Sequence, residues 1–220
     1  MEIPLFPLPN LVLFPQVAVP LHIFEERYKL MISRCIDQSD VFGLVLLRDG
    51  AEQESEETIH RTGVTARIVE VEKLEDRRLN ILCAGESRFR VLEFTGNEPY
   101  WTAEVELVDD IEDEDESEGV YERVSRLYRK AMELTSRVKE MEIPNLDLPQ
   151  SPLGLSYMVS YVLDLKAERK QELLEIPSPF LRLTALVDDL ESIILQLEQQ
   201  VSLQGKAYKA GNNGHLRKST

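Results

Sequence analysis

The chain has 220 residues, of which 43% are hydrophobic and 30% charged, a composition typical of a globular protein with its own core. Its formal net charge of −15 argues against electrostatic binding to nucleic-acid phosphates or to anionic lipid. No apolar run approaches the roughly 20 residues that a membrane helix needs, and the amino terminus lacks the basic start of a signal peptide, so we expect a cytoplasmic location.

Prolines interrupt the strongly apolar first 28 residues at five positions, Pro4, Pro7, Pro9, Pro15 and Pro20. Because each proline lacks a backbone donor and fixes φ, the stretch is not expected to form a helix or a central strand. Its leucine, valine and phenylalanine side chains nevertheless require burial. The sequence therefore predicts extended pieces along a sheet edge or barrel rim, with residues 11–14 and 17–19 as the pairing stretches.

Helical and strand-like patterns alternate in the next part of the chain. A helix of about three turns is predicted by an apolar stripe at helical spacing, formed by Phe24, Tyr28, Met31, Ile32, Cys35 and Ile36. The apolar run 41–47 predicts a buried strand, and the acidic residues 49–58 predict a solvated loop. Further strands are expected at 64–71, 79–84, 89–94 and 101–108, joined by links such as 75–78 and 85–87.

The second half has a different character. Eight carboxylates crowd residues 109–118 and repel one another, so we place a domain boundary there. Apolar side chains then alternate steps of four and three over 120–141 and 180–201. With helix starts at the Ser-Pro pairs 151–152 and 178–179 and a short helix at 170–175, they predict a four-helix bundle.

Two ordered motifs near the amino terminus resemble a known family. They are Pro-Leu-Phe-Pro-Leu-Pro-Asn-Leu-Val-Leu-Phe-Pro at 4–15 and Pro-Leu-His-Ile-Phe-Glu-Glu-Arg-Tyr at 20–28. Together they closely resemble the opening of the LON substrate-binding domain, the amino-terminal domain of Lon proteases that also occurs as a free-standing protein. The resemblance continues at 63–68, 79–91 and 100–105, and more weakly at 170–175 and 181–183. It departs at Gln16, where the family usually has glycine, and at Glu26, where it often has proline.

The resemblance implies an α+β fold, in which a PUA-like, mostly antiparallel β-barrel domain precedes an α-helical bundle. We therefore expect a β domain at 1–108, an acidic linker at 109–118, a helical domain at 119–204 and a disordered tail at 205–220. It also implies a recognition domain without the ATPase and protease modules, because the chain contains no P-loop and ends at 220 without room for either module.

Few residues offer catalytic chemistry. His22, His60 and His215 lie far apart in the sequence, and no nucleophile or metal partner accompanies them. Cys35 and Cys83 lack CxxC spacing and fit core packing. We therefore expect no enzyme activity, no catalytic residue, no metal site and no cofactor.

The leading hypothesis is a non-enzymatic module that binds unfolded or degron-bearing polypeptides, or docks them to a protease or chaperone. The predicted binding residues are Leu11, Leu13, Phe14 and Arg27, because the prolines leave this stretch incompletely paired and Arg27 lies at the flank of the helical stripe. A helix-surface ion pair with Glu26, or with a neighbouring loop carboxylate, is the alternative for Arg27. Phe14 and Tyr28 are expected to be important for packing.

Two alternatives stay open. The long four-three patterns at 120–141 and 180–201 serve either an internal bundle or pairing with a partner or a second copy, so an adaptor or homo-oligomer is the second hypothesis. PUA-like folds in other proteins bind RNA, and the arginines at 77, 78, 88 and 90 form a candidate patch. Acidic neighbours and the net charge argue against this third function.

Overall fold

The computed structural model describes residues 1–213 except 39, 52, 76–77, 112–118 and 143–146, and gives only the backbone of 205–213. Its contacts divide the chain into two compact units. The first unit consists of Met1–Asp113 and Ser156–Pro179, and the second of Glu114–Leu155 and Phe180–Thr220. Among the described residues, no helix combines the length and the apolar character that crossing a bilayer requires.

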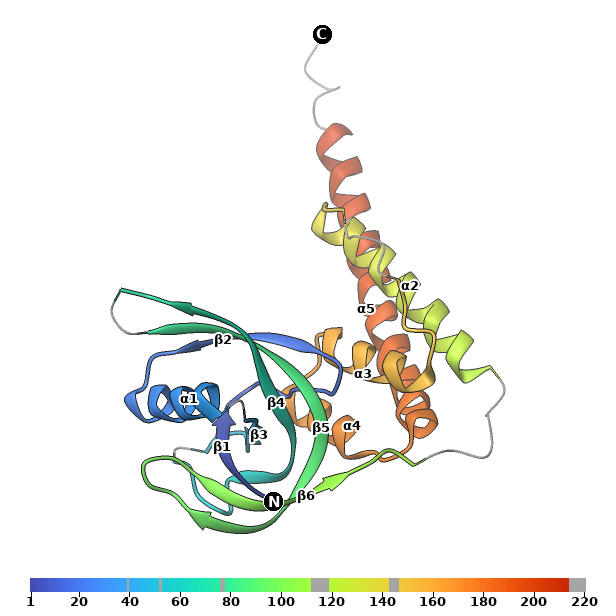
Figure 1. The fold of residues 1–220 in the computed structure, drawn as a ribbon. Helices are drawn as coiled ribbons and strands as arrows, with labels where there is room; N and C mark the ends of the chain where they lie inside the picture. Colours follow the sequence, from blue (N-terminus) through green and yellow to red (C-terminus); the bar gives the residue numbers. More distant parts are fainter. Residues whose placement is uncertain (39, 52, 76–77, 112–118, 143–146, 214–220) are drawn as a thin grey trace. The chain divides into compact units, whose positions relative to one another are not determined.

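The first unit is built on a closed sheet (Figure 1). Its strands are β1 (Glu2–Leu8), β2 (Ala18–Ile23), β3 (Phe42–Leu47), β4 (Ile59–Lys73), β5 (Leu79–Gly96) and β6 (Thr102–Val108). They lie in the order β2-β5-β4-β3-β1-β6, and pairing of β5 with β6 closes the ring. The β1–β3 pair is parallel and the other ladders are antiparallel. The barrel and the helices described below confirm the predicted α+β fold.

Strand β1 is one of the strands of the ring and lies between β3 and β6, so the expectation that its prolines exclude a central strand is wrong. The reason is that β1 uses its two halves differently. Glu2–Pro4 pair with β6, whereas Leu5–Leu8 pair with β3. Each half therefore has one principal hydrogen-bonding neighbour, and Pro4 and Pro7 each lack a donor where only one ladder is formed.

The loop that follows β1 also differs from the prediction. Residues 11–14 form no strand, although Val12, Leu13 and Phe14 are buried, and β2 begins only at Ala18. This loop crosses β5 at Gly85, where Gln16 N–H donates to the Gly85 carbonyl at 2.9 Å. A side chain at position 85 would lie 2.3 Å from the Phe14 carbonyl oxygen, so the close crossing requires glycine.

Gly85 is part of a continuous strand, which corrects the predicted link at 85–87. Strand β5 runs unbroken from Leu79 to Gly96. Its first half pairs with β2 and its second half with β6, while β4 accompanies both halves. Register shifts in the β4–β5 ladder bend the two strands. One long hairpin therefore contributes both to the barrel and to the part of the sheet that includes β2.

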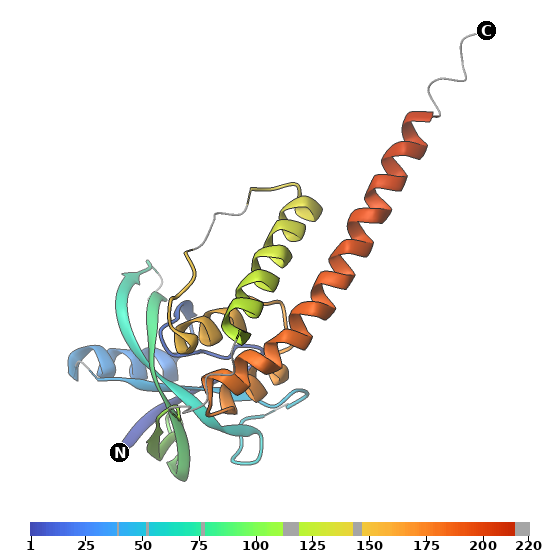
Figure 2. The ribbon, with the colours of Figure 1, turned by 90° about the vertical axis from the view of Figure 1, so that its right-hand side faces the viewer.

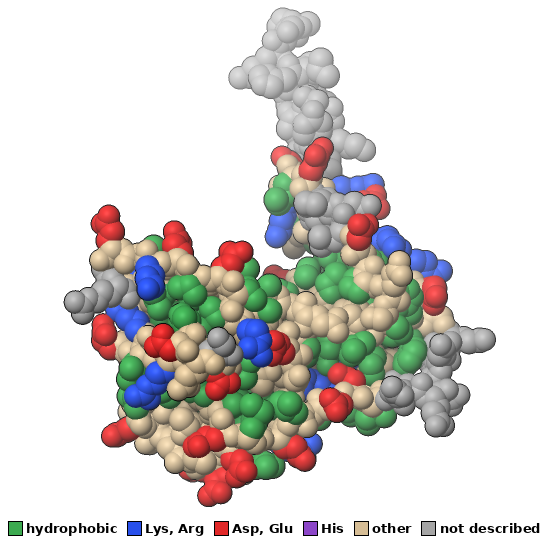
Figure 3. Space-filling view, viewed as in Figure 1, with side chains coloured by type: hydrophobic (Ala, Val, Ile, Leu, Met, Phe, Trp, Pro, Cys, Tyr) green, Lys and Arg blue, Asp and Glu red, His purple; other side chains and the backbone are tan. Residues whose placement is uncertain are grey.

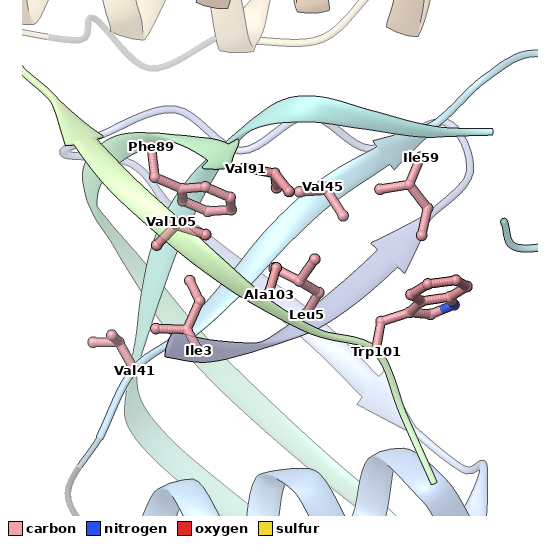
Figure 4. Packing of buried hydrophobic residues seen from close by; sticks show 10 residues of the cluster. All are labelled: Ile3, Leu5, Val41, Val45, Ile59, Phe89, Val91, Trp101, Ala103 and Val105. Carbon is pink, nitrogen blue, oxygen red and sulfur yellow. The ribbon is translucent and has the colours of Figure 1, made fainter. Parts of the chain in front are cut away.

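The barrel interior is apolar, as Figure 4 shows. The cluster consists of Ile3, Leu5, Val41, Val45, Ile59, Phe89, Val91, Trp101, Ala103 and Val105. Helix α1 (Glu26–Gln38) follows β2 and buries Tyr28, Met31, Ile32 and Cys35, as its stripe predicted. The ends of that stripe, Phe24 and Ile36, are exposed instead.

Part of the helical region belongs to the barrel unit. Helix α4 (Ala167–Glu175) and most of α3 (Pro152–Val162) fall within the first unit, although both were expected in the helical domain at 119–204. The buried Arg88 of β5 contributes to the grouping of α4 with the barrel. Its guanidinium donates to the carbonyls of Leu174 at 3.1 Å and Asp109 at 3.0 Å, and so joins the end of α4 to the sheet.

The second unit contains helices α2 (Val120–Lys139) and α5 (Pro179–Asn213), which lie side by side (Figure 2). Ion pairs join Arg123 to Glu191 at 2.7 Å and Lys130 to Glu198 at 2.6 Å. Both partners advance in the same direction along the chain, so the two helices run parallel. Their long connection passes through residues 140–178.

The predicted disordered tail at 205–220 is only partly within the described residues. Helix α5 continues to Asn213, and this corrects the expected helix end at 204. The alanines and lysines of 206–210 favour helix, which gives a local reason for the continuation. Residues 214–220 lie outside the described residues, as do 112–118 of the predicted acidic linker.

Candidate functional site

Two of the predicted binding residues lie in the core. The exposed fractions of Leu13 and Phe14 are 1% and 0%, and the Phe14 ring packs 6.1 Å from the ring of Tyr157. Leu11 is half-buried. Buried side chains present no surface to a polypeptide, so Leu13 and Phe14 stabilise the unit in this structure rather than contact a client.

Arg27 is the predicted residue whose surroundings are most polar. Its Nη1 and Nη2 donate to the two carboxylate oxygens of Glu54 at 2.8 and 2.6 Å, and its Nε donates to Glu25 at 2.9 Å. The guanidinium also lies 4.4 Å from the centre of the Tyr28 ring. The loop carboxylate expected as an alternative partner of Arg27 is therefore Glu54, and this ion pair joins the acidic loop at 49–58 to α1.

Tyr28 completes this cluster. Its hydroxyl donates to Glu54 at 2.9 Å, and its ring packs 4.1 Å from that of Phe6. Burial and the adjacent Glu54 carboxylate raise the pKa of Tyr28 well above its usual value. The phenol consequently remains a hydrogen-bond donor throughout the physiological pH range.

A pocket of about 410 Å³ opens beside this cluster at one end of the barrel. We call it the mouth pocket, and it is lined by Arg27, Leu47, Ala51, Gln53, Glu54, Asn97 and Trp101. The position follows from the strand ends, because β3 ends at Leu47, β5 ends just before Asn97 and β6 begins just after Trp101. Arg27 is thus next to an opening and is paired with a carboxylate, and its role in binding stays a prediction.

The edge of β2 is the second candidate surface. Among the described residues, β2 pairs with β5 alone. The Val17 carbonyl accepts a hydrogen bond from Gly85 N–H at 2.8 Å, so the backbone groups of Val17 point toward β5. Alternation along the strand then directs those of Ala18, Pro20 and His22 away from β5, toward the open edge. Pro20 contributes a carbonyl there but no donor.

Exposed side chains accompany this edge. Phe24, just beyond β2, is 60% exposed, and its ring stacks 6.0 Å from that of His22. On the face drawn in Figure 3, hydrophobic side chains gather beside the β4–β5 hairpin, with acidic side chains scattered around them. The edge therefore combines open backbone groups with apolar contact area, the two features that an extended polypeptide needs.

A third opening, of about 560 Å³, involves arginine side chains. Arg48, Arg61 and Arg90 line it together with Glu56, Glu57, His60 and Glu175. Arg88 does not belong to this surface, because it is 3% exposed and bound to backbone carbonyls. The arginine patch considered for RNA binding is therefore interrupted by a buried residue.

The histidines and cysteines form no chemical centre within the described part of the chain. His22, on β2, contacts Asn80 at 2.8 Å, whereas His60, on β4, contacts Glu168 of α4 at 3.1 Å. Cys35 and Cys83 are buried free thiols. No group of three or more histidine, cysteine, aspartate or glutamate residues among those described is placed to hold a metal ion.

Sequence patterns did not identify Glu54 as the partner of Arg27, or Asn97 as a residue of the mouth pocket. Both lie in loops whose composition predicts only exposure, and neither stands at a fixed spacing from α1. Trp101 belongs to the barrel cluster, but its position at the barrel mouth depends on how the strands close, which no sequence pattern shows.

The chain was compared with known proteins. Residues 2–192 match the model of the ATP-dependent protease La (LON) substrate-binding domain. The Lon protease of Dictyoglomus thermophilum is 28% identical over 79% of this chain and 22% of that protein, and the Lon protease of Anaeromyxobacter dehalogenans is 25% identical over 98% and 26%. The chain thus spans about a quarter of the length of these curated relatives.

Solved structures agree with the family match. The Lon N-terminal domain protein from Xanthomonas campestris is 25% identical, with a TM-score of 0.65 over 86% of this chain and 98% of that one. The N-terminal domain of the Mycobacterium avium complex Lon protease has a TM-score of 0.64 at 20% identity, a likeness that concerns the fold. With the family model covering most of its length, the chain belongs to the LON substrate-binding domain family.

Proposed function

We propose that this chain is a non-enzymatic recognition module that binds exposed segments of unfolded or degron-bearing polypeptides through the open edge of β2. The observation that carries the proposal is the one-sided pairing of β2, in a chain that belongs to a substrate-binding family. Handing a bound client to a protease or chaperone is part of the same proposal.

The chemistry of the edge supports this function. An extended segment added alongside β2 forms main-chain hydrogen bonds with Ala18 and His22, which are independent of the client's sequence. Phe24 adds exposed apolar area at the end of the strand. Such a surface suits clients that share exposed backbone and hydrophobic side chains rather than one motif.

Pro20 limits how tightly the edge binds. It removes one of the donors that would face the added strand, and prolines on edge strands oppose uncontrolled sheet growth. The edge is therefore suited to weak, reversible capture of a client rather than to permanent pairing with another copy.

Removal of a second edge donor tests the proposal. In Ala18→Pro the substituted residue loses the N–H that faces the open edge, while the β2–β5 hydrogen bonds of Val17 and Val19 are kept. We expect capture of a fluorescently labelled, permanently unfolded client to weaken by about tenfold, equivalent to about 1.4 kcal/mol. Fluorescence anisotropy gives the dissociation constant.

Ala18→Val is the matched control, because it changes the same residue and keeps the N–H. It should bind the client like the parent protein. Circular dichroism and thermal unfolding of both variants check that the sheet is intact. Equal affinity of a folded Ala18→Pro protein and the parent would exclude the β2 edge, and failure of the parent to bind any unfolded client would exclude the function.

A further inference from the structure

The floor of the mouth pocket is formed by the aromatic ring of Trp101. Trp101 is the single tryptophan and is 8% exposed. Figure 4 shows its ring at the end of the barrel cluster, beyond Leu5 and Ala103. Phe94 supports it in an edge-to-face contact, with ring centres 5.4 Å apart. The exposed part of Trp101 therefore belongs to a fixed ring rather than to a mobile side chain.

The walls of the pocket are neutral despite two charged residues. The Arg27 guanidinium and the Glu54 carboxylate form a two-pronged pair, so each charge is matched by the other. Leu47 and Ala51 add apolar surface. A side chain that enters this pocket meets no unbalanced charge, so the pocket favours an uncharged occupant over an acidic or basic one.

Two amide side chains at the pocket keep their hydrogen-bonding capacity. Gln53 and Asn97 line it, and neither side chain makes a hydrogen bond to another residue within the described ranges. Each amide offers donors and an acceptor, which match the N–H and C=O groups of a peptide. A pocket with an apolar floor and a few polar groups is the usual form of a site for a small group.

We propose that the mouth pocket binds one aromatic side chain of a polypeptide, with Trp101 and the Arg27 guanidinium against the ring and Gln53 and Asn97 on the adjoining peptide groups. An aromatic ring gains both edge-to-face contact with the indole and contact with a cation. The volume of about 410 Å³ lies near the lower end of the roughly 300–1,000 Å³ typical of ligand pockets and suits a single large side chain.

The pocket is also close to the β2 edge along the chain. Arg27 follows the exposed Phe24 by three residues, which span at most roughly 10 Å. A client that extends along β2 past Phe24 therefore reaches the pocket. The polypeptide nature of the ligand rests on the proposed function, whereas the aromatic selectivity rests on the pocket itself.

The single tryptophan gives a direct measurement. A five-residue peptide with blocked ends, carrying 4-iodophenylalanine between serine and glycine residues, brings a heavy atom that quenches indole emission on contact. We expect saturable quenching of Trp101 in the full chain, reversal by the same peptide with phenylalanine, and no reversal by the alanine peptide.

Filling the pocket provides the matched variant. Ala51→Leu places extra methyl groups in the pocket and should weaken quenching by about tenfold, whereas Ala51→Ser, which adds little volume, should behave like the parent. Calorimetric binding of the iodinated peptide without quenching would overturn the pocket and leave client binding at β2 standing. Quenching by a protein that captures no unfolded client would support the pocket and overturn the proposed function. Absence of both signals would overturn both.

Discussion

Gln16 has a backbone conformation that is unfavourable for a residue with a side chain. Its φ is +63°, in the left-handed region where glycine is readily accommodated, and its N–H donates to Gly85. The loop turns sharply here before it crosses β5, and glycine would adopt this φ with less strain than glutamine.

Gln16→Gly should raise the free energy of unfolding by about 0.5 kcal/mol. Relief of left-handed strain contributes roughly 1 kcal/mol, and the greater freedom of glycine in the unfolded chain offsets part of it. Urea unfolding followed by circular dichroism measures the change. Asn10→Gly is the control, since Asn10 also has a positive φ of 61° but asparagine tolerates it, so little gain is expected there. A loss of stability in Gln16→Gly would show that the glutamine side chain is needed.

At the level of elements, the Arg27–Glu54 pair joins α1 to the loop after β3. Glu54 is the more buried partner, with 16% of its side chain exposed against 35% for Arg27. The pair therefore contributes to stability, because loss of Arg27 leaves the largely buried Glu54 carboxylate without its cation.

Arg27→Gln should lower the free energy of unfolding by about 1 to 2 kcal/mol, a range that allows for partial solvent screening. This differs from the near-neutral effect expected of an unpaired surface arginine. Chemical denaturation at low and high salt is the measurement. Lys29→Gln serves for comparison, since its partner Glu26 is 87% exposed, and it should change stability by no more than about 0.5 kcal/mol. Equal effects of the two substitutions would mean that Glu54 is adequately solvated alone.

Local patterns predicted the elements better than their pairing. The stripe of α1 came from helical periodicity and β3 from a continuous apolar run, and burial imposes both signals on each element separately. The central position of β1 was missed because the proline rule assumes ladders on both sides of the same residues. Likewise, Gly85 was expected to lie in a link between two strands, whereas it lies within β5 and allows the loop at 11–17 to cross that strand closely.

The candidate site was predictable only in part for a related reason. Arg27 was identified from its place at the flank of a helix, yet its partner Glu54 is set by tertiary structure and carries no spacing signal. Leu13 and Phe14 were chosen from their apolar character, which indicates burial as well as binding. The open edge of β2 depends on the order of strands in the closed ring, which one sequence does not determine.

On the scale of the whole molecule, the first unit is discontinuous in sequence. Residues 156–179 join the barrel unit although they lie between the two segments of the second unit in the chain. Arg88 and the contact of Gln171 with the Thr62 carbonyl at 3.0 Å are part of this association. A polypeptide comprising residues 1–108 alone would lack these contacts.

A chain cut between the predicted domains should therefore stay assembled. With a specific protease site introduced within residues 112–118, we expect the two fragments to co-elute in size-exclusion chromatography and to appear as one complex by native mass spectrometry. The uncut protein and a mixture of separately purified fragments are the controls. Separation of the fragments without denaturant would mean that 156–179 contribute little to holding the first unit together.

Closure of the barrel by β1 and β6 has a consequence for synthesis. The amino group of Met1 donates to the Val105 carbonyl at 2.9 Å across a separation of 104 residues. At roughly 5 to 20 residues per second, a ribosome takes on the order of 5 to 20 s to make the intervening chain. During that interval the backbone of Glu2–Pro4 has no β6 to pair with, so the nascent chain is itself an incompletely paired, apolar polypeptide that chaperones can bind.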